Sequence, residues 1–591
     1  MTKEIKTCQN CKQNFIIELE DFAFYERIQV PPPTFCPECR LQRRMTWRNE
    51  RTLYHTKCAA TGKNIISMFD PESPIVVYDH DYWWSDNWDQ LASGRDYDFS
   101  KPFFVQFREL LEKAPLPNLA NTNVINSDYG NHNADMKNCY LTYASFENEN
   151  VDYSRGAHRC KDSMDLYVIE KAEQSYESVE CDRVSRVFFS YDADDSVNCY
   201  FLNACDDMTD STACINLDHK SNHIFNQPHT KEDYKRQLGN FDFGSHQKLE
   251  EFKEKFKKFI ENHPRRFSTI IKSQDSTGDM VVNSKNCKYS FDVYDNAEDC
   301  KYIIHALNIK DSYDGYGFGA NSDLLYEGID SGIDASQYKF TTYAHKNRNI
   351  EYVYACHSSD NLFGCVGLRN KKYCVLNKQY TKEEYKTLVP KIKKHMEEMP
   401  YIDKKGRVYK YGEFFPTELS PFAYNETIAQ EYFPINQERA EQSGFSWKSP
   451  KEKSYQTTIK ANELPDHIKD VEDGILNETI ACEHAGKYSE QCTTAFKIIP
   501  QELQFYRQFN FPLPRLCPNC RHYQRLKQRN AFRLWHRKCQ CESQKSSNGK
   551  YSNIVKHFHG DTPCTVEFET PYSPDRPEII YCEKCYQEET A

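Results

Sequence analysis

Cysteine pairs near the start of the chain are the residues with the most specific chemistry. Cys8 and Cys11 form one C-x-x-C pair, and Cys36 and Cys39 form a second. Each pair supplies two thiolates from one tight turn, and two such turns complete a tetrahedral zinc site. Cysteines that merely fill an apolar core have no reason to pair at this spacing. We therefore predict a zinc site with these four ligands.

The C-terminal end of the chain is a copy of the N-terminal end. Adding 481 to each residue number aligns the two ends without a gap from the second cysteine onward. We therefore interpret the two ends as one duplicated module. The aligned cysteines are Cys11 with Cys492, Cys36 with Cys517, Cys39 with Cys520, and Cys58 with Cys539.

The copied module predicts a second zinc site. Ser489 stands where Cys8 would be, so we assign Cys482 as the fourth ligand and keep His484 as its rival. The predicted ligands are Cys482, Cys492, Cys517 and Cys520.

A third zinc site follows from an alignment with a larger offset. An offset of 503, which allows for a longer loop after Cys541, aligns residues 69–83 with 572–586. Four C-terminal cysteines then face Ala60, Thr61, Asp79 and Tyr82, and a coordinated absence is what a lost zinc site would produce. The predicted ligands are Cys541, Cys564, Cys582 and Cys585, with His557 and His559 as competitors. Cys539, whose partner Cys58 remains, is assigned a structural role.

Both ends also carry a recognisable motif. The motif is a C-x-x-C pair, a following Phe, E-x-x-F-Y and P-x-x-C-P-x-C-R, and it lies between Cys8 and Arg40 with Asp21 at the place of the Glu, which the C-terminal copy has at Glu502. This pattern resembles the probable zinc-ribbon family of treble-clef type, and the resemblance implies that the second cysteine pair opens a helix. The whole chain resembles long, uncharacterised bacterial proteins with this ribbon at both ends. The resemblance implies an architecture and zinc ligands, and no activity.

Arginines recur every four residues after the C-terminal cysteine pair. On a helix this spacing forms one ridge. Arginine presents a planar fork of donors that suits phosphate, and neighbouring aromatic residues could stack on bases. We therefore expect nucleic-acid contact, preferably with RNA or single strands. The candidate residues are Arg40, Arg44, Arg48, Arg521, Arg525, Arg529, Arg533 and Arg537.

Two alternatives compete with nucleic-acid binding. The arginines could instead pair with acidic side chains of the middle segment and clamp the ribbons onto it, which would leave a protein-interaction scaffold. The acidic, aromatic segment 78–100 could form a glycan site, as β-helices host carbohydrate-active sites. No two carboxylates there are singled out by their spacing, so we expect a protein that is not an enzyme.

The middle of the chain must position these ends. Between positions 120 and 377, short segments rich in aromatic and branched residues recur in two blocks, at a nearly constant step of eleven to thirteen positions. A short fixed period is typical of a solenoid, and segments this short favour strands with alternating inward and outward side chains. We predict a parallel β-helix or β-solenoid with two segments, about 24 residues, in each coil. Cys139, Cys199, Cys287 and Cys300 are expected to be stacked interior thiols.

Helices are predicted where the blocks end. Thr230 with Asp233, and Thr381 with Glu384, have the spacing of an N-cap and an acidic third residue. Residues 249–266 have the apolar periodicity of an amphipathic helix, and the polar segment 446–462 is a candidate linker.

The predicted fold is mainly β, a duplicated solenoid flanked by zinc ribbons with a few capping helices. The predicted divisions are a treble-clef ribbon at 1–60, a degenerate metal-free ribbon at 61–119, solenoid halves at 120–227 and 279–377, capping and linking helices at 228–278, a capping helix and linker at 378–480, a treble-clef ribbon at 481–540 and a last ribbon at 541–591.

Composition limits the compartment and the partners. The chain has 591 residues, a net charge of −11 and 25 cysteines, many of them in C-x-x-C pairs. This pattern favours a reducing compartment with metal-bound thiolates over a disulfide framework. No apolar run is long enough to cross a bilayer, so we expect a cytoplasmic protein with three Zn²⁺ ions and a partner that is RNA or protein, in an undetermined oligomeric state.

Overall fold

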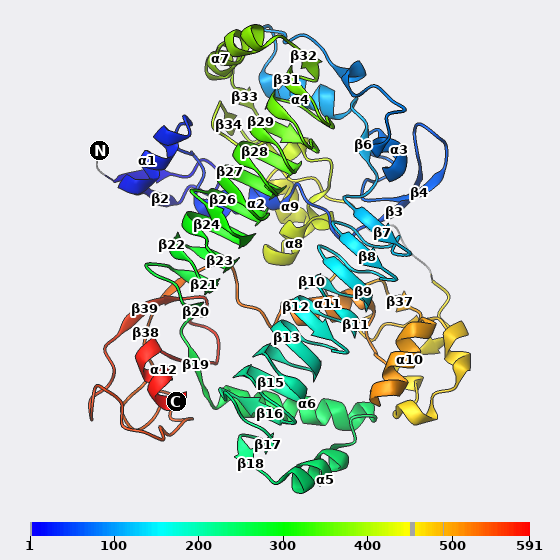
Figure 1. The fold of residues 1–591 in the computed structure, drawn as a ribbon, viewed down its shortest axis with the longest axis vertical. Helices are drawn as coiled ribbons and strands as arrows, with labels where there is room; N and C mark the ends of the chain where they lie inside the picture. The colour runs from blue at the N-terminus through cyan, green and yellow to red at the C-terminus, as the bar shows by residue number, and fades with distance from the viewer. Residues whose placement is uncertain (1–2, 450–454, 489, 591) are drawn as a thin grey trace.

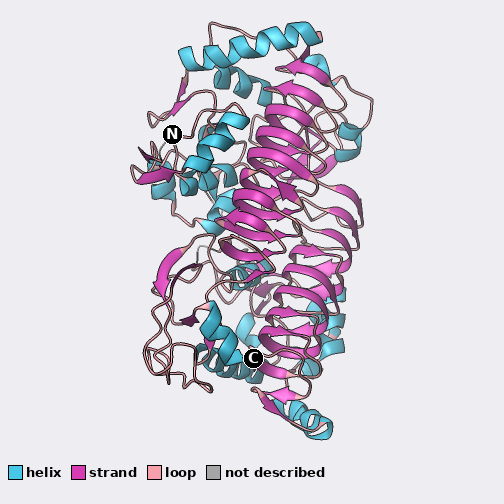
Figure 2. Ribbon diagram, turned by 60° about the vertical axis from the view of Figure 1, so that its left-hand side comes forward, coloured by secondary structure: helices cyan, strands magenta, loops and turns pink. Residues whose placement is uncertain are grey.

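The protein is mainly β in a computed structural model that describes residues 3–449, 455–488 and 490–590. Its two largest sheets have 12 and 13 strands, and Figure 1 shows them along the long axis of the molecule, with helices at the ends and flanks. Figure 2 shows their strands stacked like rungs along this axis. Residues 450–454 of the predicted linker lie outside the described residues.

The first parallel sheet covers residues 122–228. Its strands run parallel except at the last pair, which is antiparallel. The strands are β7 (Thr122–Ile125), β8 (Ala134–Lys137), β9 (Phe146–Asp152), β10 (Arg155–His158), β11 (Lys161–Met164), β12 (Tyr167–Glu173), β13 (Val179–Phe188), β14 (Tyr191–Asp194), β15 (Val197–Asp206), β16 (Thr212–Ile215), β17 (His223–Ile224) and β18 (Gln227–Pro228).

The second parallel sheet covers residues 270–379 and also ends in one antiparallel pair. Its strands are β20 (Ile270–Ile271), β21 (Gly278–Val282), β22 (Lys285–Lys288), β23 (Ser290–Tyr294), β24 (Glu298–Leu307), β25 (Ile309–Lys310), β26 (Tyr313–Phe318), β27 (Ser322–Ser331), β28 (Ser336–Ala344), β29 (Arg348–Tyr354), β30 (Asp360–Phe363), β31 (Lys372–Val375) and β32 (Lys378–Gln379).

The strand register shows that each segment pairs with the segment immediately after it. Thr122 pairs with Ala134, and Ala134 pairs with Phe146, so paired positions in the first sheet are twelve apart in the chain. In the second sheet Cys287 pairs with Cys300, a step of thirteen positions. The predicted coil of two segments is therefore wrong, because the register already repeats after a single segment.

A three-residue repeat explains this short step. Asn138, Leu141 and Ala144 have left-handed backbone angles, with φ of 53°, 50° and 50°, and this spacing recurs through both sheets, with shifts of one position in the second, as between Gly317 and Asn321. The residue after each, such as Cys139 or Thr142, is buried. One left-handed residue turns the chain once in every three positions, so inward side chains recur with a period of three and not two. After glycine, asparagine and aspartate tolerate this conformation best.

The thiols of the middle segment lie inside the sheets, as predicted. Cys139, Cys199, Cys287 and Cys300 are at most 4% exposed, and the last two are direct partners in the register. Burial raises the pKa of Cys139 to about 11, which keeps this thiol protonated and inert.

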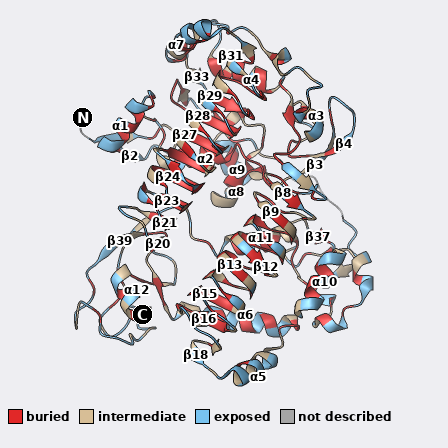
Figure 3. Cartoon of the chain, in the orientation of Figure 1, coloured by how far each residue is buried: buried red, intermediate tan, exposed pale blue. Residues whose placement is uncertain are grey.

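The predicted capping helices are present. α5 (Lys231–Phe241) begins after Thr230, whose hydroxyl accepts a hydrogen bond from the Asp233 backbone N–H. α7 (Lys382–Glu398) begins with a capping box between Thr381 and Glu384. Figure 3 shows α5 as mostly exposed, in agreement with its position beyond the end of the first sheet.

The predicted amphipathic helix is α6 (His246–Glu261), which buries Leu249, Phe252 and Phe256. It ends earlier than predicted, because residues 264–266 form strand β19 (Pro264–Arg266) and pair with β40 (Ile579–Tyr581) near the C-terminus.

The terminal modules are built from short hairpins and helices. The N-terminal ones are β1 (Glu4–Thr7), β2 (Asn14–Ile17), α1 (Leu19–Arg27), α2 (Pro37–Met45), β3 (Tyr54–Lys57), β4 (Asn64–Ser67), β5 (Val77–Tyr78), α3 (His80–Trp84), α4 (Phe103–Leu111) and β6 (Leu116–Pro117). The C-terminal ones are α8 (Ile428–Tyr432), α9 (Gln437–Gln442), β36 (Ile480–Ala481), β37 (Ala495–Phe496), α10 (Pro500–Phe509), α11 (Pro518–Leu526), β38 (Trp535–Lys538), β39 (Glu567–Thr570) and α12 (Glu583–Thr590). Within the described residues, no helix combines the length and apolar character needed to cross a membrane.

Candidate metal centres

The four N-terminal cysteines converge on one point, as their spacing predicted. Cys8 and Cys11 flank the turn between β1 and β2, while Cys36 is the N-cap of α2 and Cys39 lies in its first turn. Their sulfur atoms lie within 4.8 Å of one another, and the Cys11 and Cys36 sulfurs are 3.7 Å apart. A tetrahedron with zinc–sulfur bonds of about 2.3 Å has edges of about 3.8 Å, so the spacing suits a metal ion.

The second cluster also brings its predicted ligands together. Cys482, Cys492, Cys517 and Cys520 share a site, with two sulfur–sulfur distances of 3.9 Å. The rival His484 lies 2.8 Å from a carboxylate oxygen of Glu490, and this pair forms a further group with Cys520. Ser489 lies outside the described residues. Cys482 therefore completes a four-cysteine set without His484.

The clusters favour thiolate formation at one sulfur each. The pKa of Cys8 lies well below its ordinary value because the thiols of Cys36 and Cys39 donate to its sulfur. The pKa of Cys517 is also lowered, because the neighbouring thiols of Cys482 and Cys492 favour its ionised form. The thiolate is the form that binds metal, and the contacts that favour it at Cys8 and Cys517 raise the pKa of Cys39 and Cys520.

The third cluster corrects one predicted ligand. Cys539, and not Cys541, gathers with Cys564, Cys582 and Cys585, and all four are buried. The Cys564 and Cys582 sulfurs are 3.9 Å apart. The assignment of Cys539 to a purely structural role therefore does not hold.

The N-terminal copy explains this correction. The Cys539 sulfur accepts a hydrogen bond from the backbone N–H of Cys582 at 3.2 Å, and the Cys58 sulfur accepts one from Asp79 at 3.1 Å. Cys58 and Cys539 thus hold equivalent positions in the two copies of the module. Cys541 lies in an adjacent group with His557, His559 and Cys585.

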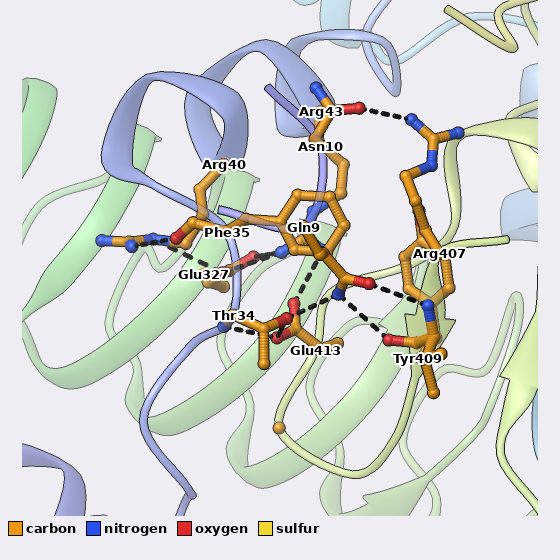
Figure 4. Close-up of polar contacts among 12 residues, drawn as sticks. Gln9, Asn10, Thr34, Phe35, Arg40, Arg43, Glu327, Arg407, Tyr409 and Glu413 are labelled. Carbon is orange, nitrogen blue, oxygen red and sulfur yellow. Dashed lines mark hydrogen bonds and ion pairs between the residues drawn. The ribbon is translucent and has the colours of Figure 1, made fainter. Parts of the chain in front are cut away.

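The arginines of α2 point into the second parallel sheet. Arg40 donates two hydrogen bonds to the Asp314 carboxylate, at 3.0 and 2.8 Å, and Arg44 donates one at 3.3 Å. Arg43 binds Glu327 on β27 and Glu413, at 2.9 Å each. Figure 4 shows Arg43 between Glu327 and Glu413, and Glu413 also accepts hydrogen bonds from the backbone N–H and the hydroxyl of Thr34. The helix is fixed to the sheet by paired, buried charges.

The arginines after the C-terminal cysteine pair point into the first parallel sheet. Arg521 and Arg525 both bind the Asp165 carboxylate, at 3.1 and 2.6 Å. Arg529 binds Glu180 of the first sheet and donates to both oxygens of Asp292 in the second, at 2.6 and 2.7 Å. This one side chain connects both sheets to the C-terminal ribbon.

The two junctions repeat each other across the duplication. Asp165 and Asp314 are separated by the same interval as Tyr153 and Tyr302, which face the guanidinium groups of the aligned residues Arg521 and Arg40. The N-terminal helix α2 docks on the second sheet and the C-terminal helix α11 on the first. In Figure 1, α2 accordingly lies beside β26 and β27, and α11 beside β12.

Burial separates the predicted arginines into two groups. Arg40, Arg44, Arg48, Arg521, Arg525 and Arg529 are at most 8% exposed. Arg533 has a side chain 59% exposed, and Arg537 donates to the carbonyl oxygens of Tyr572 and Ser573. The predicted single helical ridge is interrupted as well, because α11 ends at Leu526. Six of the eight residues predicted to bind nucleic acid are therefore enclosed by protein in this structure.

Opposite charges hold the carboxylate of Glu50, beside Arg48 and Arg155, in its ionised form. Burial raises the pKa of Glu50, but the positive charges of Arg155 and Arg48 outweigh burial and bring that pKa to about 2. Arg155 also donates to the Tyr316 hydroxyl at 2.6 Å, which joins the first sheet to the second.

A cavity beside His132 and Asp330 has a volume of ≈ 10 Å³, room for about one water molecule.

The acidic, aromatic segment 78–100, which we considered as a glycan site, packs against Arg369 of the second sheet. Trp83, Trp84 and Trp88 surround the guanidinium of Arg369, which donates to the carbonyl oxygens of Trp84 and Ser85. Trp83 is fully buried. These contacts attach the N-terminal module to the second sheet near its end.

Comparisons with known proteins supply no relative. No family model matches the chain, and a search of curated proteins finds no significant match.

Proposed function

We propose that this protein is a metal-stabilised, non-enzymatic scaffold in which two treble-clef zinc ribbons clamp the halves of a duplicated β-solenoid. Two features support the solenoid, the parallel register that repeats every twelve or thirteen positions and the three-residue repeat of left-handed backbone angles. The gap-free copy at an offset of 481 supports two ribbons of one kind.

Zinc is the ion that suits these sites best. Four-cysteine sets with nearly tetrahedral spacing are typical of structural zinc, and they leave no open coordination position for a substrate. We therefore assign a folding role, and not a catalytic one, to the three four-cysteine clusters.

The inward direction of the arginines is the observation that carries the scaffold proposal. A guanidinium that is at most 8% exposed and bonded to a carboxylate of the same chain cannot be reached by a phosphate on another molecule. The basic periodicity is thus explained by internal clamping, as with Arg521 and Arg525 on Asp165. This favours a protein-interaction scaffold over the nucleic-acid binder that we expected from the sequence.

Purification from the native cell, with and without nuclease treatment, tests the proposed function. We expect the same protein partners to co-purify in both samples, because contacts of a protein scaffold do not pass through nucleic acid. Arg533→Gln, which removes an exposed arginine, serves as a control and should leave the partner set unchanged. Loss of the partners on nuclease treatment would contradict the proposal and restore RNA as the ligand.

A further inference from the structure

A second group of metal-ligating side chains adjoins the third cysteine cluster. Cys541, His557, His559 and Cys585 place one ligand atom each within 4.8 Å of one another. The Cys541 sulfur lies 3.0 Å from His557 Nδ1 and 3.3 Å from His559 Nε2. In a tetrahedral zinc site with bonds of about 2.3 Å to sulfur and about 2.0–2.1 Å to nitrogen, this edge is about 3.6 Å. A shift of a few tenths of an ångström would fit an ion.

The outer nitrogens of both histidines already have partners. His557 Nε2 lies 2.7 Å from the Glu589 carboxylate, and His559 Nδ1 lies 2.6 Å from the Thr562 carbonyl oxygen. Each acceptor fixes the proton on the outer nitrogen and leaves the lone pair of the inner nitrogen directed at the site. This is the arrangement that hydrogen-bond acceptors around a metal site impose on the histidines that bind the metal.

Glu589 is itself held in place. It is 4% exposed and also accepts from the Tyr551 hydroxyl at 2.8 Å and from the Ile554 backbone N–H at 2.6 Å. Three polar groups of the loop thus converge on a carboxylate in α12, which aligns His557 with the cluster.

The two groups share Cys585. We propose that the C-terminal module binds two zinc-class ions, one held by Cys539, Cys564, Cys582 and Cys585 and the other by Cys541, His557, His559 and the same Cys585 sulfur as a bridge. Both ions then have four ligands, and five thiolates face two dications, which nearly balances the charge of this buried site.

The duplication supports a metal-binding role for the loop between Cys541 and Cys564. The alignment offset changes from 481 before the loop to 503 after it, so the C-terminal copy has a longer loop here, and this loop carries both histidines. The N-terminal copy lacks the insertion and has Ala60 in place of Cys541. The added loop and its ligands therefore occur together.

The loop has little apolar packing of its own. Ile554 is 74% exposed, and Val555 and Phe558 are 43% exposed. Since an apolar core does not fold this segment, an ion held by His557 and His559 supplies the missing constraint.

Metal counting on the full-length protein tests the proposal. Native mass spectrometry and elemental analysis should give four zinc ions per chain, one for each four-ligand group. His559→Ala should lower the count by one, whereas His536→Ala, at an exposed histidine of the same module, should leave it unchanged. A count of three that does not respond to His559→Ala would overturn the second ion.

Cadmium-113 resonance of the wild-type protein tests the bridge without a variant that must fold. Two resonances coupled to each other through one cysteine sulfur are expected. Two uncoupled resonances, or a single one from this module, would overturn the shared Cys585.

Discussion

Replacing Cys36 with serine is expected to release one metal ion and to unfold the N-terminal ribbon while both parallel sheets persist. A structural zinc site contributes roughly 10–16 kcal/mol of apparent binding free energy to its own module. The free energy of metal binding that is lost with one of the four ligands should therefore exceed the stability of a module this small. Hydrogen exchange should rise by orders of magnitude in α1 and α2, with protected amides retained in β24 and β27.

The matched control is Cys58→Ser, in the same module. Cys58 is buried but has lost its partner ligands, so this change should leave the metal count unaltered and cost only about 1 kcal/mol, the order of one weakened hydrogen bond. Equal loss of metal in both variants, or collapse of both sheets with Cys36→Ser, would contradict the assignment of ligands and the independence of the ribbon.

Asp314→Asn is expected to destabilise the protein by about 3–5 kcal/mol, because it leaves buried arginines without a counter-charge. Arg40 and Arg44 both donate to Asp314, and all three side chains are at most 2% exposed. Among the acidic side chains that the structure describes, only Glu327, at 3.8 Å from each, would remain paired with these two guanidinium groups. The expected result is a lower denaturant midpoint with the folded spectrum retained at zero denaturant.

Asp311→Asn provides a control with the same chemical change. Asp311 and Asp314 both have left-handed backbone angles, φ 49° and 59°, so asparagine fits each position equally. Asp311 pairs with Arg27, whose side chain is 54% exposed, and such pairs contribute about 0–1 kcal/mol. If the two variants lose the same stability, the buried clamp does not hold the ribbon.

The sequence predicted correctly those features whose motif has few physical explanations. The paired cysteines and the threonine N-caps each have few alternative explanations, so Cys36, Cys517 and Thr381 were placed correctly in clusters and caps. The ligand predicted for the third cluster was Cys541, whereas the structure places Cys539 there, and the two cysteines are separated by a single residue. Cys58, which aligns with Cys539, was the available signal for the right ligand. Its meaning depends on the hydrogen bond from the Asp79 backbone N–H to its sulfur, which matches the bond from Cys582 to Cys539 and which the sequence does not display.

Two other features could not be predicted from the sequence, and each has a physical reason. Charge periodicity reports that arginines share a side, but not whether that side meets solvent or protein, so Arg521 and Arg525 were interpreted as exposed donors. The three-residue repeat depends on left-handed backbone angles at Leu141, Val168 and Phe201, residue types that rarely adopt them. Stacking of successive turns imposes that conformation, and local propensity gives no hint of it.

Arginine-selective labelling of the native protein, followed by peptide mass spectrometry, tests the central claim most directly. If the arginines clamp the ribbons from inside, Arg533 and the exposed Arg236 should react quickly, while Arg40, Arg44, Arg521 and Arg525 should react only after the metal is removed by chelation. Rapid labelling of Arg521 and Arg525 in the metal-loaded native protein would place them at the surface and contradict the account.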